Sequence, residues 1–195
     1  MNVGANIRCI DSHTMGEATR IIVGGVPVLK GNTVMEKKKY FLEHYDYIRK
    51  MAMLEPRGHA DMFGALLTEP CDPSADYGVI FLDGGGCLNM CGHGTIGVCT
   101  VLVETGTEIT LEAPAGLVRA QVEVKDGEVV QVSFKNVPAF LYKKDVTVDV
   151  PELGRKITCD ISFGGSFFAI VKDEEMGVEI DPKNLDDIVP KALAL

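Results

Sequence analysis

The sequence predicts an α+β fold in which an antiparallel sheet closes, barrel-like, around a central buried helix. From residue 109 onward, apolar and polar side chains alternate in short runs, as they do in strands with one buried face. Residues 96–103, by contrast, are apolar nearly all round, which is typical of a helix enclosed by other elements. Antiparallel strands packed around this helix would bury both patterns.

The chain is expected to begin with two strands and a long helix. Two short apolar runs, residues 7–10 and 19–23, predict the strands. Thr33 and Glu36 have the spacing of a capping box, and apolar side chains then recur at helical intervals until Pro56. This pattern predicts one amphipathic helix.

A strand, a glycine turn and a helix are expected next. Residues 62–67 and 77–82 predict two strands, and the second is followed by the glycines at 84–86. The motif at residues 89–97 then leads into the apolar helix, which ends near Gly106.

The remaining chain is expected to consist mainly of strands. Alternating and apolar runs predict strands at residues 109–112, 117–124, 129–134, 139–142, 146–150, 157–161 and 167–171. A hairpin turn is predicted at residues 125–128, and a helical pattern starts at Leu185.

Composition limits the class of protein. The 195 residues, 46% hydrophobic and 24% charged, are typical of a globular chain with one domain or two small ones. A net charge of −9 argues against a nucleic-acid partner, because binding to phosphates needs a basic surface. No run of about 18 apolar residues and no basic-then-apolar leader occurs, so we expect neither a membrane span nor secretion. The six cysteines form no CxxC pair, which favours reduced thiols in a cytoplasm.

Cys91 is the candidate reactive residue. We expect it at the start of the apolar helix, where unpaired N–H groups and the helix dipole favour a thiolate. A helix start can lower the pKa of a cysteine from roughly 8.5 by one to several units. The glycines at 92, 94 and 97 would let a ligand carboxylate approach the same N–H groups.

Three motifs resemble the proline racemase family. They are residues 90–97 (MCGHGTIG), residues 11–20 (DSHTMGEATR) and residues 55–64 (EPRGHADMFG), and the likeness runs from about residue 7 to residue 170. The resemblance implies a cofactor-independent isomerase without a metal, which inverts the Cα of proline or a hydroxyproline with two cysteines on opposite faces of the substrate. It also implies one half of a two-domain, diaminopimelate-epimerase-like fold.

The resemblance assigns roles to four residues. Cys91 resembles the first of the two cysteines, and Gly92 and His93 the positions whose backbone groups hold the substrate carboxylate. Phe63 matches a position that lines the ring pocket. The family's second cysteine lies in a DRSPCGTG-type motif that does not occur here, so we expect the chain by itself to be inactive or nearly so.

The resemblance also suggests a division of the chain. Residues 1–163 would form the N-terminal catalytic half, and residues 164–195 would start a second, incomplete half, with the boundary near Gly164 and Gly165. The expected partner is a small amino-acid substrate, and a homodimer is an option.

Several alternatives stay open. Interconversion of L- and D-proline is the first hypothesis, and hydroxyproline 2-epimerase or trans-3-hydroxyproline dehydratase activity is the nearest rival. In another hypothesis the chain is a non-catalytic half-domain that pairs with a separate chain. In a third it is a thiol hydrolase that uses Cys91 and a histidine. The side chain of His93 could tune Cys91, although its backbone alone could do the work, because residues two apart on a helix do not face each other. A zinc site formed by Cys87, Cys91, His93 and Cys99 is disfavoured by their spacing.

Overall fold

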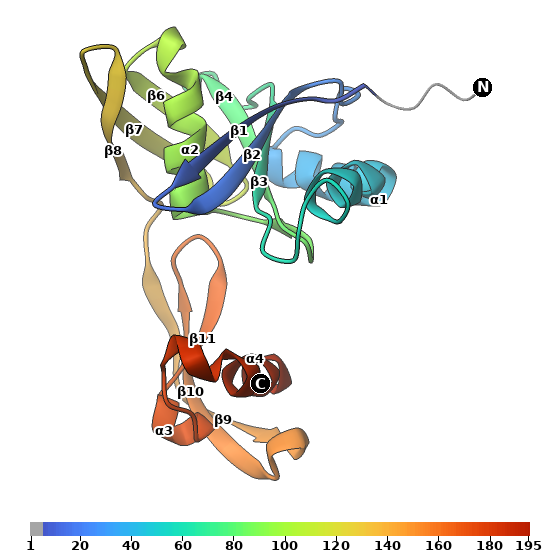
Figure 1. The fold of residues 1–195 in the computed structure, drawn as a ribbon, viewed down its shortest axis with the longest axis vertical. Coiled ribbons are helices and arrows are strands. Elements are labelled where there is room, and N and C mark those ends of the chain that lie inside the picture. The colour runs from blue at the N-terminus through green and yellow to red at the C-terminus, as the bar shows by residue number, and fades with distance from the viewer. Residues whose placement is uncertain (1–5) are drawn as a thin grey trace. The chain divides into compact units, whose positions relative to one another are not determined.

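The chain folds into two compact units. The structure, a computed structural model, describes residues 6–195, and of Thr105 only the backbone. Contacts between residues divide the chain after Val137, so that residues 138–195 form the second unit (Figure 1).

The first unit is built on one sheet of eight strands. The strands are β1 (Arg8–Thr14), β2 (Glu17–Gly24), β3 (Gly64–Thr68), β4 (Tyr77–Leu82), β5 (Cys87–Leu88), β6 (Glu108–Ala113), β7 (Gly116–Lys125) and β8 (Glu128–Lys135). They are arranged in the order β1-β2-β3-β4-β6-β7-β8, with β5 paired to β4 beside this path.

The sheet is mixed, and the prediction of an antiparallel sheet was wrong. The pairs β2–β3 and β4–β6 run parallel, whereas the other pairs run antiparallel. Each parallel pair is joined by a connection that contains a helix, because parallel neighbours cannot be linked by a tight hairpin. The two predicted helices therefore determine where the sheet becomes parallel.

Helix α1 (Val34–Met53) connects β2 to β3, and the capping box predicted its start. Thr33 is the N-cap, and its Oγ1 accepts a hydrogen bond from the Glu36 backbone N–H at 3.1 Å. The Glu36 carboxylate reaches back to the N–H of Asn32 at 2.7 Å, one residue before the position that an ideal capping box uses.

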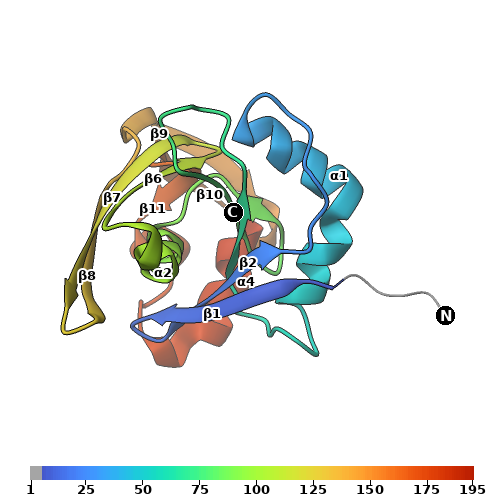
Figure 2. The same cartoon turned by 90° about the horizontal axis from the view of Figure 1, so that it is seen from above.

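Helix α2 (Gly92–Leu102) connects β5 to β6 and continues into a 3₁₀ turn (Val103–Thr105). It contacts β1, β2, β3, β7 and β8. Figure 2 shows α2 nearly end-on, with the sheet curving around it. The strand order leaves β1 and β8 as the two edges, so closure of the sheet into a barrel around a central helix stays a prediction.

The central strands are buried on both faces, which explains their continuous apolar sequence. Alternate residues of β4 belong to two cores: Val79 and Phe81 pack with α2, whereas Ile80 and Leu82 pack with α1. All four side chains are fully buried. The two helices thus cover opposite faces of the middle of the sheet.

The second unit contains a three-stranded antiparallel sheet in the order β11-β10-β9. Its elements are β9 (Phe140–Val150), β10 (Arg155–Phe163), β11 (Phe167–Val171), α3 (Asp173–Met176) and α4 (Leu185–Ala194). The strands predicted at 139–142 and 146–150 are one continuous strand, β9. Asp145 forms an irregular step inside it, with a φ of 51° and its N–H bonded to the Asp160 carboxylate at 2.8 Å.

The division into units lies earlier than the boundary expected near Gly164. Strand β10 pairs with β9 on one side and with β11 on the other, so a cut at 163/164 would separate two hydrogen-bonded strands. The assignment of residues 1–163 to a catalytic half stays a prediction. Among residues 6–195, no helix is both long enough and apolar enough to span a membrane.

Candidate functional site

Cys91 is the N-cap of α2. Its backbone is extended, with φ −146° and ψ 133°, and its side chain folds over the first turn of the helix. The Gly94 N–H points at Sγ, with N and Sγ 3.5 Å apart. The Cys91 carbonyl accepts a hydrogen bond from the Thr95 hydroxyl at 2.7 Å. The sulfur therefore lies at the N-terminal end of the helix, as the glycine turn predicted.

The side chain of His93 lies against this sulfur. Its Nδ1 is 3.2 Å from Cys91 Sγ, within hydrogen-bond distance. The expectation that residues two apart on a helix do not face each other does not apply, because the N-cap Cys91 lies outside the helical backbone. The His93 side chain is thus in direct contact with the sulfur, and whether it tunes Cys91 stays a prediction.

Phe63 packs beside the histidine. The centroids of the Phe63 and His93 rings are 4.4 Å apart in an edge-on arrangement. The ring of Phe63 also packs against that of Phe81, with the two centroids 6.2 Å apart. Phe63 directly precedes β3 and is held there by its carbonyl, which accepts the Arg20 N–H at 2.9 Å. It is 8% exposed, so it forms an apolar wall next to His93.

The three glycines of the motif have different surroundings. A Cβ at Gly97 would lie 2.8 Å from Ser12 Oγ, and one at Gly94 would lie 2.9 Å from the rings of Phe63 and Phe81. A Cβ at Gly92 would meet only Phe134, at an ordinary 3.6 Å. The expectation that all three make room for a ligand is therefore wrong for Gly94 and Gly97, which allow close packing of α2 against the sheet.

The tip of the β1–β2 hairpin reaches the start of α2. Thr14 donates its hydroxyl to the His93 carbonyl at 3.3 Å, and Glu17 Oε1 lies 4.0 Å from His93 Nε2. The motif at residues 11–20 indicated no individual role for Thr14 or Glu17. The turn residues Met15 and Gly16 could have signalled a hairpin, but only the tertiary structure shows what its tip contacts.

Burial dominates the electrostatics of the sulfur. Cys91 is half-buried and packs against the core of the first unit. Burial raises the pKa of the Cys91 thiol, hydrogen bonds from the backbone N–H groups of Gly94 and His93 lower it, and the negative charge of Glu17 raises it. The net direction is upward, opposite to the lowering expected at a helix start. A thiolate at this position thus needs a compensating positive charge.

The other candidate residues have structural surroundings. Burial raises the pKa of Cys87 and of Cys99 to about 12, so both thiols stay protonated. His13, which belongs to the motif at residues 11–20, accepts the Gly16 N–H with its Nδ1 at 3.3 Å inside the β1–β2 turn. Within the described part of the chain, no three His, Cys, Asp or Glu side chains are grouped as they would be around a metal ion.

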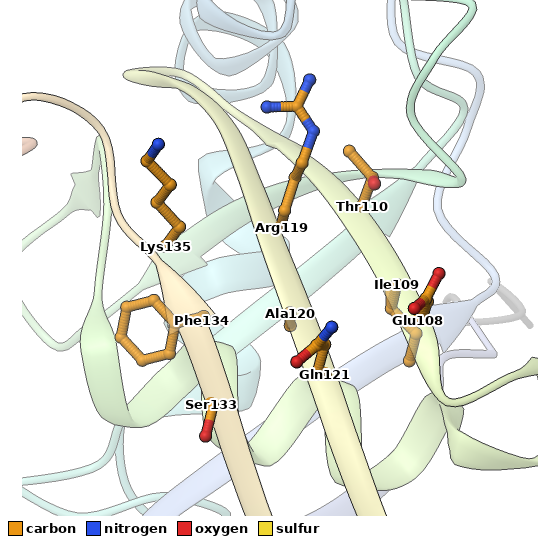
Figure 3. Close-up of a pocket in the computed structure, with 9 residues that line it drawn as sticks. All are labelled: Glu108, Ile109, Thr110, Arg119, Ala120, Gln121, Ser133, Phe134 and Lys135. Atoms are coloured by element: carbon orange, nitrogen blue, oxygen red, sulfur yellow. The ribbon is translucent and has the colours of Figure 1, made fainter.

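A cavity of about 430 Å³ lies on the sheet away from this site (Figure 3). Its charged and polar walls come from β6, β7 and β8, and include Arg119 and Lys135. Their neighbours Ala120 and Phe134 belong to the core around α2. Because side chains alternate along a strand, Arg119 and Lys135 point to the opposite face from Cys91.

Comparison with known proteins identifies the family. The model of the proline racemase family matches residues 9–195. The chain belongs to the proline racemase family. The resemblance inferred from the three sequence motifs is thus confirmed.

The curated relatives of this member of the proline racemase family include racemases and epimerases. The proline racemase of Clostridioides difficile is 54% identical over 203 aligned positions, which include 100% of this chain and 60% of that protein. A 4-hydroxyproline 2-epimerase of Streptosporangium roseum is 47% identical, with 95% and 58% of the two chains aligned. The chain spans about 60% of the length of these relatives.

Solved structures of the family superpose well on the chain. A hydroxyproline epimerase from Agrobacterium vitis with bound trans-4-hydroxy-L-proline matches with a TM-score of 0.83 at 31% identity, over 91% of this chain and 55% of that one. A probable proline racemase from Agrobacterium radiobacter with bound carbonate matches with a TM-score of 0.84 at 35% identity, over 92% and 55%. The two structures therefore share the fold of this chain over more than 90% of its length.

Proposed function

We propose that this chain provides one half of the active site of a cofactor-independent racemase that interconverts L- and D-proline. The observation that carries the proposal is the contact between Cys91 Sγ and His93 Nδ1 at the first turn of α2. The site joins a sulfur base, an imidazole and the N-terminal end of a helix in one place.

The chemical step is removal of the proton on Cα. The resulting carbanion is unstable unless donors on the carboxylate stabilise its enediolate-like form and water is excluded. The first-turn N–H groups of Gly92 and His93 have no carbonyl acceptor within the helix, and they can bind that carboxylate, the His93 N–H sharing it with the Cys91 sulfur. The open space at Gly92 supports this assignment, because a Cβ there would meet no atom closer than 3.6 Å.

The base is generated by proton transfer within the site. His93 Nδ1 takes the proton of the Cys91 thiol, which gives a thiolate beside an imidazolium without loss of a proton to water. The thiolate then takes the Cα proton and becomes a thiol again, and the electron pair of the C–H bond moves into the carboxylate. The apolar ring of Phe63 keeps water from the imidazole and shields the ring of the substrate.

Inversion also needs an acid on the other face of the substrate. In the proposed reaction a second thiol donates a proton to the planar intermediate, and Cys91 performs this role in the reverse direction. The chain contains only the first cysteine motif, that of Cys91, and lacks the motif of the second cysteine. We therefore expect the chain by itself to racemise proline weakly or not at all.

A fused polypeptide tests the two-thiol account. This fusion joins the 195-residue chain to the part of the Clostridioides difficile proline racemase that the chain does not match, about 40% of that protein. Racemisation of L-proline is followed by polarimetry for the chain alone and for the fusion. We expect activity in the fusion only, and equal activity in both would contradict the account.

His93→Asn tests the proton acceptor. Without the imidazole, a thiolate forms only by losing its proton to water, which burial of Cys91 disfavours. We expect alkylation of Cys91 by iodoacetamide at pH 7 to fall about tenfold, the effect of one pKa unit on the thiolate fraction. Mass spectrometry of the digested chain gives the rate, with the peptide of Cys71 as internal reference.

The control for this variant is His44→Asn. His44 is an exposed residue of α1 whose Nδ1 contacts the Tyr40 carbonyl, so its loss should leave the alkylation of Cys91 unchanged. Unaltered alkylation in His93→Asn would show that the imidazole does not accept the thiol proton.

Epimerisation of 4-hydroxyproline is the second candidate. It is favoured by the 47% identical epimerase of Streptosporangium roseum, and proline is preferred because the Clostridioides difficile racemase is 54% identical. Turnover of both amino acids by the fused polypeptide discriminates between them.

A further inference from the structure

The β1–β2 hairpin holds a carboxylate over the imidazole of His93. Met15 and Gly16 form its tip with positive φ angles of 52° and 96°, a tight turn that brings Thr14 and Glu17 opposite each other. The hydroxyl of Thr14 is tied to the His93 carbonyl at 3.3 Å. The tip is therefore attached to the start of α2, and Glu17 is carried with it.

The outer nitrogen of His93 lacks a hydrogen-bond acceptor. Nε2 is buried and has no partner within hydrogen-bond distance among the described residues. The carboxylate of Glu17 is the nearby charge, with Oε1 4.0 Å from Nε2. The Glu17 side chain is 52% exposed and thus has room to move the remaining distance. A protonated imidazole, which carries N–H groups on both nitrogens, would draw it closer.

We propose that Glu17 is a positioning residue that acts through His93. Its carboxylate accepts a hydrogen bond from the Nε2–H of His93. This bond holds the neutral imidazole in the tautomer whose Nδ1, beside Cys91 Sγ, is unprotonated and can accept the thiol proton. The negative charge of Glu17 also stabilises the imidazolium that forms when the thiol proton moves to Nδ1. The effect of this role on catalysis rests on the proposed function. The effect on the reactivity of the thiol does not, because Glu17, His93 and Cys91 interact without any substrate.

No other charge on the elements around α2 takes this place among the described residues. Asp11 of β1 and Arg20 of β2 pair with each other, with distances of 2.9 and 2.8 Å, and His13 bonds the Gly16 N–H. The charged residues Arg119 and Lys135 of β7 and β8 lie on the opposite face of the sheet, in the cavity of Figure 3. Strands β3 and β4 face the helix with the apolar side chains of Ala65, Val79 and Phe81.

Glu17 acts on the sulfur in two opposite ways. Its negative charge disfavours a thiolate directly, and this effect raises the pKa of Cys91. Through His93 it stabilises the imidazolium that accompanies the thiolate, which favours the ion pair. The sign of the change in Glu17→Gln therefore tells the two roles apart.

The test is the rate of Cys91 alkylation by iodoacetamide in the 195-residue chain, between pH 6 and pH 9. If Glu17 acts through His93, Glu17→Gln slows the reaction at pH 7 about two- to fivefold, the range expected for a partly exposed ion pair. In the His93→Asn background the same substitution no longer slows it. An unchanged or faster rate in Glu17→Gln, or an equal slowing in both backgrounds, would overturn the positioning role.

The matched control is Glu123→Gln. Glu123 lies on β7 and pairs with Lys125 at 3.0 Å on an exposed surface, so its neutralisation should leave Cys91 alkylation unchanged. Circular dichroism and thermal unfolding of each variant exclude loss of the fold. The result is independent of the proposed function, because failure of the fused polypeptide to racemise proline would refute that function without altering the alkylation rates.

Discussion

Replacing Cys91 with alanine is expected to reduce proline racemisation by the fused polypeptide about 10²- to 10⁴-fold, the usual contribution of a positioned general base. The loss follows because Cys91 supplies the proposed base on this face, and the other thiol of α2 cannot replace it. Cys99 is fully buried in the helix, and burial raises the pKa of its thiol to about 12. The measurement is the initial rate of racemisation at saturating L-proline.

Cys87→Ala is the control for this loss. Cys87 lies four residues earlier, in β5, and its thiol also stays protonated at neutral pH. We expect the racemisation rate to stay within about twofold of that of the unmodified fusion, because Cys87 is not the proposed base. Loss of a general base would lower the rate far more. Comparable losses in both variants, or full activity of Cys91→Ala, would contradict the role of Cys91.

The second large effect is expected on stability. Gly97→Ala should lower the free energy of unfolding by about 1–3 kcal/mol, the usual cost of added volume in a well-packed core. A Cβ there would lie 2.8 Å from Ser12 Oγ and 3.1 Å from Thr19 Cβ, and Thr19 is fully buried. Urea unfolding followed by circular dichroism measures the change.

Gly92→Ala is the comparison within the same helix. Its Cβ would contact only Phe134 at 3.6 Å, so we expect a change within about 0.5 kcal/mol, as at a site without a packing conflict. If both substitutions destabilise the chain equally, the close approach of α2 to the hairpin is not what requires glycine at position 97.

Much of the fold could be predicted because local signals were strong. The capping box at Thr33 predicted the start of α1, and the apolar run at 77–82 coincides with β4. The parallel pairs could not be seen, because strand direction depends on how the helical connections cross the sheet. The sequence predicts two strands on either side of Asp145, because a bulge residue interrupts the alternation of side chains without ending the strand.

The candidate site was predictable only in part. The glycine turn before an apolar helix indicated that Cys91 begins that helix, which the structure reproduces. The contact with the side chain of His93 depends on the fold of the N-cap, and a rule for residues inside a helix does not cover it. Glu17 lies 76 positions away from His93 in sequence, so only the tertiary structure brings the two together.

The most direct test of the central claim is protection of Cys91 in the fused polypeptide by pyrrole-2-carboxylate. This molecule has a planar α-carbon and a carboxylate, and so resembles the intermediate after proton removal. The proposed site predicts that it slows alkylation of Cys91 in proportion to its inhibition of racemisation, while Cys71 reacts at an unchanged rate. Inhibition of racemisation without protection of Cys91 would show that the sulfur at the start of α2 does not face the substrate.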